Sequence, residues 1–257
     1  MRGGILALFR KPKYYRTPEL DYFRLYDEMS QQAHLLIAGQ TGSGKSVAIN
    51  GIMYTLLRKS PQAVQFILID PKKTELFCYQ NLPHTLKYAA ENSDIIKALT
   101  YARDLMQARF SEMARKHERI YTGDSDVYIV IDELAQVTLV LKKQAINLLQ
   151  EILQLGRAAR VHIIAASQNP IIQVIPTVLK VNFTGILALK TLTKQHSRNI
   201  IGIPGCEEFP SPRIAHKALG YYLDGCEIKL YQMPMHTDKE ISDICEYWSD
   251  PKKYLVY

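Results

Sequence analysis

Short runs of apolar residues alternate along the chain with longer stretches in which apolar residues recur every three or four positions. Near-continuous apolar runs are typical of strands that helices cover on both faces. They occur at residues 35–38, 64–69, 127–131, 161–166 and 184–189. The helical spacing occurs at residues 45–59, 93–119 and 144–160. This alternation predicts an α/β fold with a mostly parallel central sheet flanked by helices.

The pattern changes near the C-terminus. Apolar runs at residues 219–223 and 227–232 flank the dipeptide Asp224-Gly225, which favours a tight hairpin turn. A glutamate three residues after Thr237 completes a capping box, so we expect the last helix to begin there.

Composition and charge narrow the classes of function. The 257 residues are 47% hydrophobic, as in ordinary globular proteins, which excludes a disordered chain. The net charge of +7 indicates either an anionic partner such as nucleic acid or a surface with extra lysines. No stretch approaches the 18 apolar residues of a membrane span. The four cysteines form no C-x-x-C pair, which fits a reduced, cytoplasmic protein.

The first expected strand, residues 35–38, leads into a phosphate-binding loop. Its G-x-x-x-x-G-K-S pattern consists of Gly39, Gln40, Thr41, Gly42, Ser43, Gly44, Lys45 and Ser46. Glycines let backbone N–H groups approach phosphate oxygens closely, and the N-terminus of the following helix attracts the same anion. We therefore expect Lys45 to reach the β- and γ-phosphates and the Ser46 hydroxyl to bind Mg²⁺.

A second motif follows the expected strand at residues 127–131, which ends in Asp132 and Glu133. In a nucleotide site, Asp132 would bind Mg²⁺ and Glu133 would activate the water that attacks the γ-phosphate. Two acids here could also simply cap the next helix, but their combination with the phosphate-binding loop favours the catalytic interpretation. The chain has no Asn-Lys-x-Asp motif for guanine, so we expect ATP rather than GTP.

These segments resemble the FtsK/SpoIIIE family of DNA translocases over about residues 33–248. Besides the two motifs above, the resemblance rests on Asp70-Pro71-Lys72, Gly156-Arg157-Ala158-Ala159-Arg160 and Gln168-Asn169-Pro170. Members of this family are RecA-like motors that form rings, usually hexamers, around DNA and pump it with ATP. The resemblance implies a RecA-like motor domain at residues 34–257, which binds ATP and Mg²⁺, moves double-stranded DNA and forms a homo-oligomer. Residues 1–33, rich in basic and aromatic residues, are expected to be an extension.

The chain departs from the family pattern in several respects. We find no membrane-spanning segment and no C-terminal winged-helix domain, and Arg160 stands where a glycine is usual. The first two departures favour a stand-alone motor from a mobile element or a virus. If the protein acts at a membrane, a membrane-protein partner must bring it there.

Gln168 and Arg157 are further candidates for catalysis. An amide at Gln168, after the apolar run at residues 161–166, could contact the γ-phosphate and orient water, or it could only cap the strand. The resemblance implies the first role. It also implies that Arg157 reaches the nucleotide of a neighbouring subunit. Arg160 and Arg198 are rivals for this role, and a surface ion pair is the alternative for each.

The DNA contacts are expected on loops that face the pore of a ring. Lys142 and Lys143 follow the second motif, and Lys180 follows the Gln168 segment, although all three could be ordinary solvated lysines. Two other functions stay open at this stage. One is a pump for viral genomes or single-stranded DNA, and the other is an ATP-dependent switch that moves nothing.

Overall fold

The computed structural model describes residues 13–15, 22–168, 175–212 and 218–250. Much of the expected extension at residues 1–33 lies outside the described residues, and so do Asn169 and Pro170 of the family resemblance.

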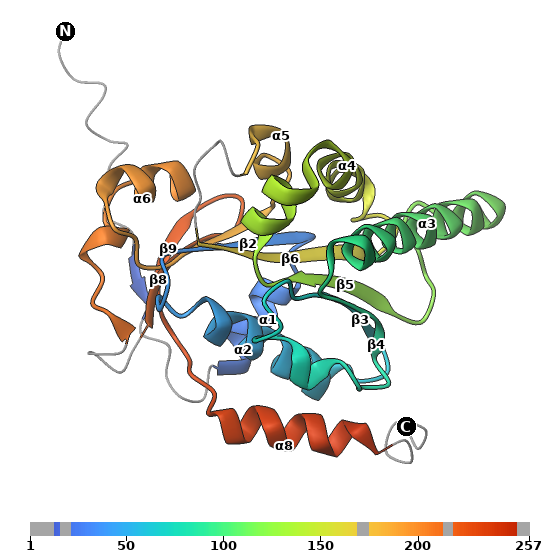
Figure 1. Ribbon diagram of the computed structural model, residues 1–257, viewed down its shortest axis with the longest axis horizontal. Helices are drawn as coiled ribbons and strands as arrows, with labels where there is room; N and C mark the ends of the chain where they lie inside the picture. Colours follow the sequence, from blue (N-terminus) through green and yellow to red (C-terminus); the bar gives the residue numbers. More distant parts are fainter. Residues whose placement is uncertain (1–12, 16–21, 169–174, 213–217, 251–257) are drawn as a thin grey trace, which may run out of the picture.

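A mixed sheet forms the centre of the molecule (Figure 1). Within the described residues it has nine strands in the order β1-β9-β8-β7-β2-β6-β5-β3-β4. The strands from β7 to β4 run parallel, and β8 and β9 form an antiparallel hairpin beside β7. The strands are β1 Lys13–Tyr15, β2 His34–Ala38, β3 Val64–Ile69, β4 Thr85–Ala89, β5 Asp126–Ile131, β6 Val161–Ser167, β7 Gly185–Ala188, β8 Ala218–Leu223 and β9 Ile228–Met233. The predicted α/β fold with a mostly parallel sheet is confirmed.

Helices cover both faces of this sheet, and each face has its own apolar core. One core includes residues of α3 and α4, and the other includes residues of α1, α2 and α8 (Figure 1). The helices are α1 Tyr22–Ser30, α2 Lys45–Lys59, α3 Asn92–Lys116, α4 Leu134–Leu155, α5 Thr177–Lys180, α6 Lys194–Ile201 and α8 Asp238–Ser249, with short 3₁₀ turns η3 Phe77–Tyr79 and η4 Cys206–Glu208. In the part of the chain that is described, no helix combines the length and apolar character needed to cross a membrane.

Helix α1 was not expected from the sequence, yet it belongs to the packed core. Leu25, Tyr26 and Met29 are buried, and the Tyr26 hydroxyl donates a 2.6 Å hydrogen bond to the Pro234 carbonyl. A Cβ added to Gly51 on α2 would lie 2.2 Å from the Tyr26 ring, so this close packing requires glycine. The last residues of the segment that was predicted to be an extension therefore pack against α2 as part of the core.

The C-terminal elements form as the sequence predicts. Leu223 pairs with Ile228 across the hairpin, and Gly225 has a φ of 91°, a left-handed conformation that glycine adopts readily. Helix α8 begins after Thr237 with the expected capping box, in which both reciprocal hydrogen bonds with Glu240 are present.

Helix α4 differs from the expected helix at residues 144–160. It begins ten residues earlier, at Leu134, and ends at Leu155. The helix is interrupted at Lys142, whose φ of 48° and ψ of −134° are not helical. The periodic pattern that marked residue 144 as a start therefore belongs to the second half of a kinked helix.

Candidate nucleotide site

The topology of the sheet brings the predicted motifs to one edge. Because β2, β6, β5 and β3 run parallel as neighbours, the segments after their carboxyl ends meet there. The phosphate-binding loop follows β2, Asp132 and Glu133 follow β5, and Gln168 follows β6. Strand β6 lies between β2 and β5, so Gln168 stands between the two motifs.

The phosphate-binding loop has the backbone conformation that its glycines permit. Gly42 and Gly44 have φ values of 72° and 102°, and Gly44 precedes the first turn of α2. A Cβ on Gly39 would lie 2.6 Å from the Ser43 hydroxyl oxygen. The loop therefore holds its backbone close-packed in front of the N-terminus of a 15-residue helix, an arrangement that attracts phosphate.

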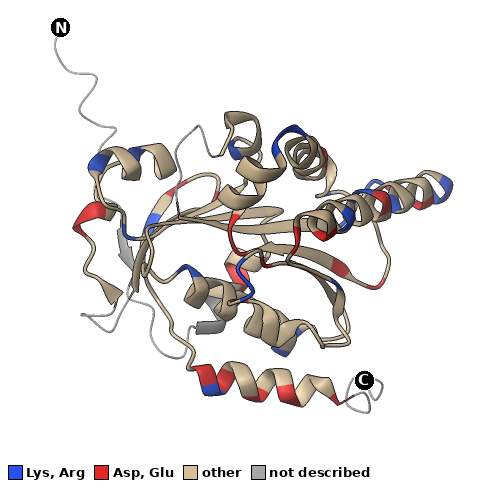
Figure 2. Cartoon of the chain, viewed as in Figure 1, with Lys and Arg blue, Asp and Glu red and all other residues tan. Residues whose placement is uncertain are grey.

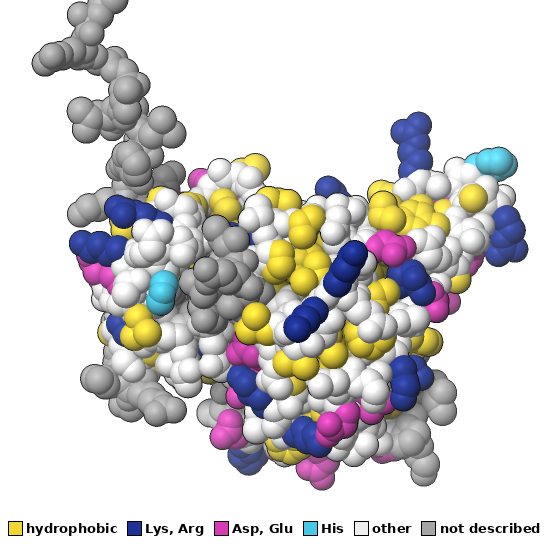
Figure 3. Space-filling model, turned by 45° about the horizontal axis from the view of Figure 1, so that its top comes forward, with side chains coloured by type: hydrophobic (Ala, Val, Ile, Leu, Met, Phe, Trp, Pro, Cys, Tyr) yellow, Lys and Arg dark blue, Asp and Glu magenta, His cyan; other side chains and the backbone are white. Residues whose placement is uncertain are grey.

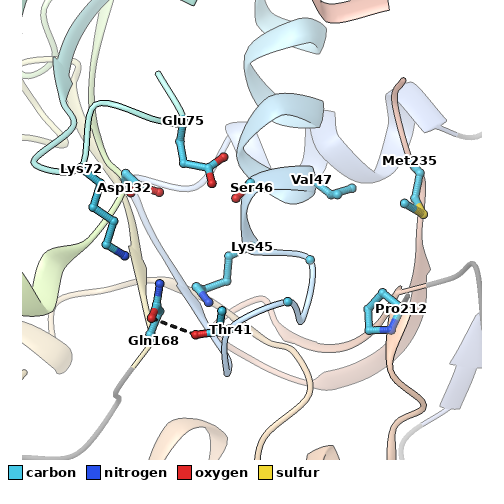
Figure 4. A pocket seen from close by; sticks show the side chains of 12 residues that line it. Thr41, Lys45, Ser46, Val47, Lys72, Glu75, Asp132, Gln168, Pro212 and Met235 are labelled. Carbon is cyan, nitrogen blue, oxygen red and sulfur yellow. Dashed lines mark hydrogen bonds between the residues drawn. The ribbon is translucent and has the colours of Figure 1, made fainter. Parts of the chain in front are cut away.

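A cavity of ≈ 440 Å³ opens at this edge (Figure 4). Its polar lining comes from the phosphate-binding loop, from the segment after β3, and from the ends of β5 and β6. The polar and charged lining residues are Thr41, Lys45, Ser46, Lys72, Glu75, Asp132 and Gln168. Cations and carboxylates thus face one another across a space suited to a phosphorylated ligand with a divalent cation.

Lys45 lies folded over the phosphate-binding loop. Its ammonium donates 2.9 Å hydrogen bonds to the carbonyl oxygens of Gly39 and Gln40. Burial lowers the pKa of Lys45 to about 8, and the nearby carboxylate of Glu133 opposes this shift. An anionic phosphate beside Lys45 would favour its charged form.

Asp132 and Ser46 line the cavity together and fit the predicted Mg²⁺ site. Asp132 is buried, and its Oδ2 atom has no hydrogen-bond partner among the described residues. Burial raises the pKa of Asp132 to about 6, with a further contribution from the Glu75 carboxylate. A carboxylate and a hydroxyl are ligands that Mg²⁺ accepts alongside water and phosphate oxygens. Mg²⁺ would supply the positive charge that stabilises Asp132 in its ionised form.

Glu133 is held on both carboxylate oxygens. Oε1 accepts a 3.1 Å hydrogen bond from the backbone N–H of Gln168, and Oε2 lies 3.1 Å from the Lys72 ammonium. The Gln168 side chain turns to the phosphate-binding loop instead, where its Oε1 accepts a 3.0 Å hydrogen bond from the Thr41 hydroxyl (Figure 4). Glu133, Gln168 and Thr41 therefore form one chain of contacts between the two motifs.

The segment after β3 supplies residues to which the sequence reasoning assigned no role. Lys72 and Glu75 line the cavity, and buried Asp70 accepts hydrogen bonds from the backbone N–H groups of Glu75 (3.2 Å) and Leu76 (3.0 Å). One sequence signal could have indicated a role for them, because this segment directly follows an apolar run that predicts a buried strand. Only the fold shows that Lys72 points to Glu133.

The three candidate arginines differ in their surroundings. Arg157 is exposed and lies in the turn after α4, not on the helix that was expected to carry it. Arg160 forms an ion pair with Asp126 (2.7 Å), and its φ of 54° explains why glycine suits this position. Arg198 is exposed on α6. The ion pair gives Arg160 a structural explanation and leaves Arg157 and Arg198 as candidates.

The candidate DNA-contact lysines lie on the helical layer of α4 and α5. Lys142 and Lys143 are exposed at the interruption of α4. Lys180 is half-buried and donates to the Asn199 carbonyl, so its ammonium is engaged within the chain. In Figure 2 the cartoon of α4 and α5 carries blue Lys and Arg positions, and Figure 3, turned so that the top of the molecule comes forward, shows basic side chains beside exposed hydrophobic ones. Leu139, Val140, Val178 and Val181, on and beside these helices, are exposed.

Known proteins resemble this chain over most of its length. The FtsK/SpoIIIE family model matches residues 21–122. The DNA translocase FtsK of Staphylococcus aureus is 32% identical over 242 residues, covering 85% of this chain and 30% of the relative. That of Rickettsia typhi is 32% identical over 266 residues, covering 87% and 35%. The chain belongs to the FtsK/SpoIIIE family. This FtsK/SpoIIIE chain spans about a third of the length of the relatives it matches.

Solved structures support the fold of this FtsK/SpoIIIE chain. The pCW3 conjugation coupling protein TcpA, in its monomer form with ATPγS, superimposes with a TM-score of 0.71 at 20% identity, covering 85% of this chain and 66% of that one. The type VII secretion ATPase EccC of Thermomonospora curvata gives 0.69 at 19% identity, covering 85% and 28%. The predicted RecA-like P-loop fold is confirmed.

Proposed function

We propose that this protein is an ATP-driven motor that hydrolyses ATP with Mg²⁺ to move double-stranded DNA through a homo-oligomeric ring. Residues 34–257 form the motor domain. In this proposal the ring is a hexamer in the cytoplasm. It serves the transfer of a plasmid or another mobile element.

One observation carries this proposal. The cavity places the Lys45 ammonium, the Ser46 hydroxyl, the Asp132 carboxylate and Gln168 around one space, while Glu133 lies beside it in contact with Gln168. Each group then has a task. Lys45 binds the β- and γ-phosphates, and Ser46 and Asp132 hold Mg²⁺. Gln168 contacts the γ-phosphate and orients the attacking water, and Glu133 accepts a proton from that water. FtsK/SpoIIIE relatives named as DNA translocases support coupling this chemistry to DNA.

The direct test is the rate of ATP hydrolysis with and without double-stranded DNA. We expect DNA of unrelated sequences to stimulate hydrolysis similarly, because a motor that tracks phosphates needs no particular sequence. Stimulation by single-stranded DNA alone would favour a single-strand pump. ATP binding without DNA-stimulated hydrolysis would favour the switch.

The contact surface is tested by a salt titration of DNA affinity. Each phosphate contact contributes a slope of about −0.9 on a log–log plot, because it releases counterions. Replacing Lys142 and Lys143 by glutamine should reduce this slope by at most about two for each subunit engaged. The double variant Lys97→Gln and Lys116→Gln removes two exposed charges from α3 and serves as the control. Equal loss in both double variants would refute the assignment to α4.

A further inference from the structure

Lys72 stands between the cavity and the proposed general base. It lines the cavity with a side chain that is 34% exposed, and its ammonium lies 3.1 Å from the Glu133 carboxylate. The Glu133 side chain is 7% exposed and does not line the cavity. In Figure 4 the amino group of Lys72 points to the side where Gln168 and Lys45 lie. Lys72 can therefore reach a ligand in the cavity without any change in the fold.

The ion pair has a consequence for the chemistry. Glu133 accepts one hydrogen bond from Gln168 N–H and another from Lys72, so both oxygens are engaged. A general base needs a hydrogen bond from the attacking water to one of its oxygens. Each carboxylate oxygen can accept two hydrogen bonds, so Lys72 competes with this water for Oε2 without excluding it. Departure of Lys72 therefore frees an acceptor site on Glu133 for the water of the proposed reaction.

A γ-phosphate offers Lys72 a stronger partner. The pair with Glu133 is reached by solvent on the lysine side, so water can solvate the ammonium as it turns away. A terminal phosphate carries more negative charge than a carboxylate and presents three strong acceptor oxygens. An ammonium on a flexible four-carbon stem can turn from one anion to the other.

We propose that Lys72 is an exchange residue, which pairs with Glu133 when no γ-phosphate is bound and transfers to the γ-phosphate of bound ATP, thereby releasing Glu133. The inference rests on the proposed ATPase function and adds a way for the site to recognise ATP over ADP. ADP lacks the γ-phosphate, so it leaves the pair intact.

The neighbouring lysine provides a matched control. Lys73 forms its ion pair with Glu91 at 2.6 Å, and these two side chains are 59% and 68% exposed. Lys73 does not line the cavity. Lys72→Ala and Lys73→Ala therefore remove the same charge at adjacent positions, and only the first removes it from the cavity.

The first test measures the dissociation constants of Mg²⁺-ATPγS and Mg²⁺-ADP by calorimetry on the whole chain. Lys72→Ala should weaken ATPγS binding about tenfold, the worth of a charge-assisted hydrogen bond, and change ADP binding less than about twofold. Lys72→Arg should restore part of the preference for ATPγS, and Lys73→Ala should change neither constant. Equal weakening of both nucleotides by Lys72→Ala would mean general attraction and would overturn the exchange.

The second test asks whether Glu133 competes with the nucleotide for Lys72. With Lys72 present, Glu133→Gln should tighten ATPγS binding about two- to fivefold, because no ion pair has to be broken. In the Lys72→Ala background the same change should tighten binding less. Simple repulsion between Glu133 and phosphate predicts the opposite order, since an unpaired Glu133 repels more, and that result would also overturn the exchange.

Failure of this inference can be told apart from failure of the proposed function. The binding tests need neither DNA nor hydrolysis. If the parent protein binds ATPγS more tightly than ADP but DNA does not stimulate its hydrolysis of ATP, the motor is refuted and the exchange is not. A parent that binds ATPγS and ADP equally tightly would refute the exchange alone, and a parent that binds neither would refute both.

Discussion

Glu133 is the residue on which the proposed chemistry depends most directly. Glu133→Gln keeps the shape of the side chain and leaves Asp132 and Ser46 in place, so ATP and Mg²⁺ should still bind. Hydrolysis should fall by about 10²–10⁴, the usual contribution of a positioned general base. Lys45→Ala should slow hydrolysis and, unlike Glu133→Gln, should also weaken nucleotide binding. Measuring nucleotide affinity beside the steady-state rate separates the two effects, and a Glu133→Gln variant that hydrolyses at the parent rate would remove Glu133 from this role.

His34 makes the stability of the fold depend on pH. It is buried at the start of β2, where its Nδ1 accepts a 3.1 Å hydrogen bond from the Ile163 N–H. Burial lowers the pKa of His34 from 6.5 to about 3, with a smaller contribution from the charge of His162. The folded protein therefore keeps His34 neutral at pH values where the unfolded chain already binds a proton. His34 has no effect on stability above pH 6.5, and it destabilises the fold as the pH falls from 6.5 toward 3.

The expected slope from His34 is up to about 1.4 kcal/mol of unfolding free energy per pH unit. Denaturant unfolding of the parent and of His34→Gln between pH 7.5 and about 5 should show a shallower decline in the variant. His117→Gln changes an exposed histidine at the end of α3 and should leave the slope unchanged. Parallel curves for the parent and His34→Gln would contradict this account.

At the scale of single elements, the interruption of α4 is the most distinctive feature. A φ of 48° with a ψ of −134° is unfavourable for a residue with a Cβ and costs about 1–3 kcal/mol. Lys142→Gly should therefore stabilise the fold, whereas Lys143→Gly, next to it within the helix, should destabilise it by about 1 kcal/mol. Unfolding in denaturant measures both. If Lys142 contacts DNA, its glycine variant binds DNA more weakly while being more stable, a combination that a general folding defect does not produce.

The elements also show where the sequence was informative. The five buried strands, the final hairpin and α8 were predicted because each has a local signal, such as an apolar run, a turn dipeptide or a capping box. Strand β4 was not predicted, because it lies at the edge of the sheet and four of its five residues are half-buried or exposed. Helix α1 lacks a start signal, and its burial depends on the distant residues Gly51 and Pro234.

Some residues of the candidate site were likewise predicted from local signals, and others were not. The phosphate-binding loop, Asp132 and Glu133 were predicted because their spacing from apolar strands is itself a signal. The contact between Lys72 and Glu133 joins residues 61 positions apart and depends on β3 lying beside β5. No local pattern encodes that neighbourhood.

At the scale of the whole molecule, the sheet separates Arg157 from the nucleotide site of its own subunit. Arg157 precedes β6, whereas Gln168 and the cavity lie after it. Seven residues of strand span about 20 Å. Arg157 therefore cannot reach the nucleotide in its own cavity, and a role in catalysis requires a second subunit whose cavity faces it. Such a contact is head-to-tail, and repeated contacts of this kind form a ring when the rotation between neighbouring subunits closes.

This arrangement predicts rescue between two inactive variants. Arg157→Ala subunits keep Glu133, and Glu133→Gln subunits keep Arg157. Where the cavity of an Arg157→Ala subunit faces a Glu133→Gln neighbour, the interface contains an intact Glu133 and an intact Arg157. About a quarter of the interfaces in a randomly mixed ring would be of this kind. ATP hydrolysis of the mixture should exceed the sum of the two separate preparations, and it should rise steeply with protein concentration.

Arg198→Ala mixed with Glu133→Gln is the control, because Arg198 is also exposed but lies on α6. Rescue with Arg198→Ala and none with Arg157→Ala would transfer the role to α6, whereas the absence of rescue in both mixtures, with normal oligomers, would show that neither arginine acts across the interface.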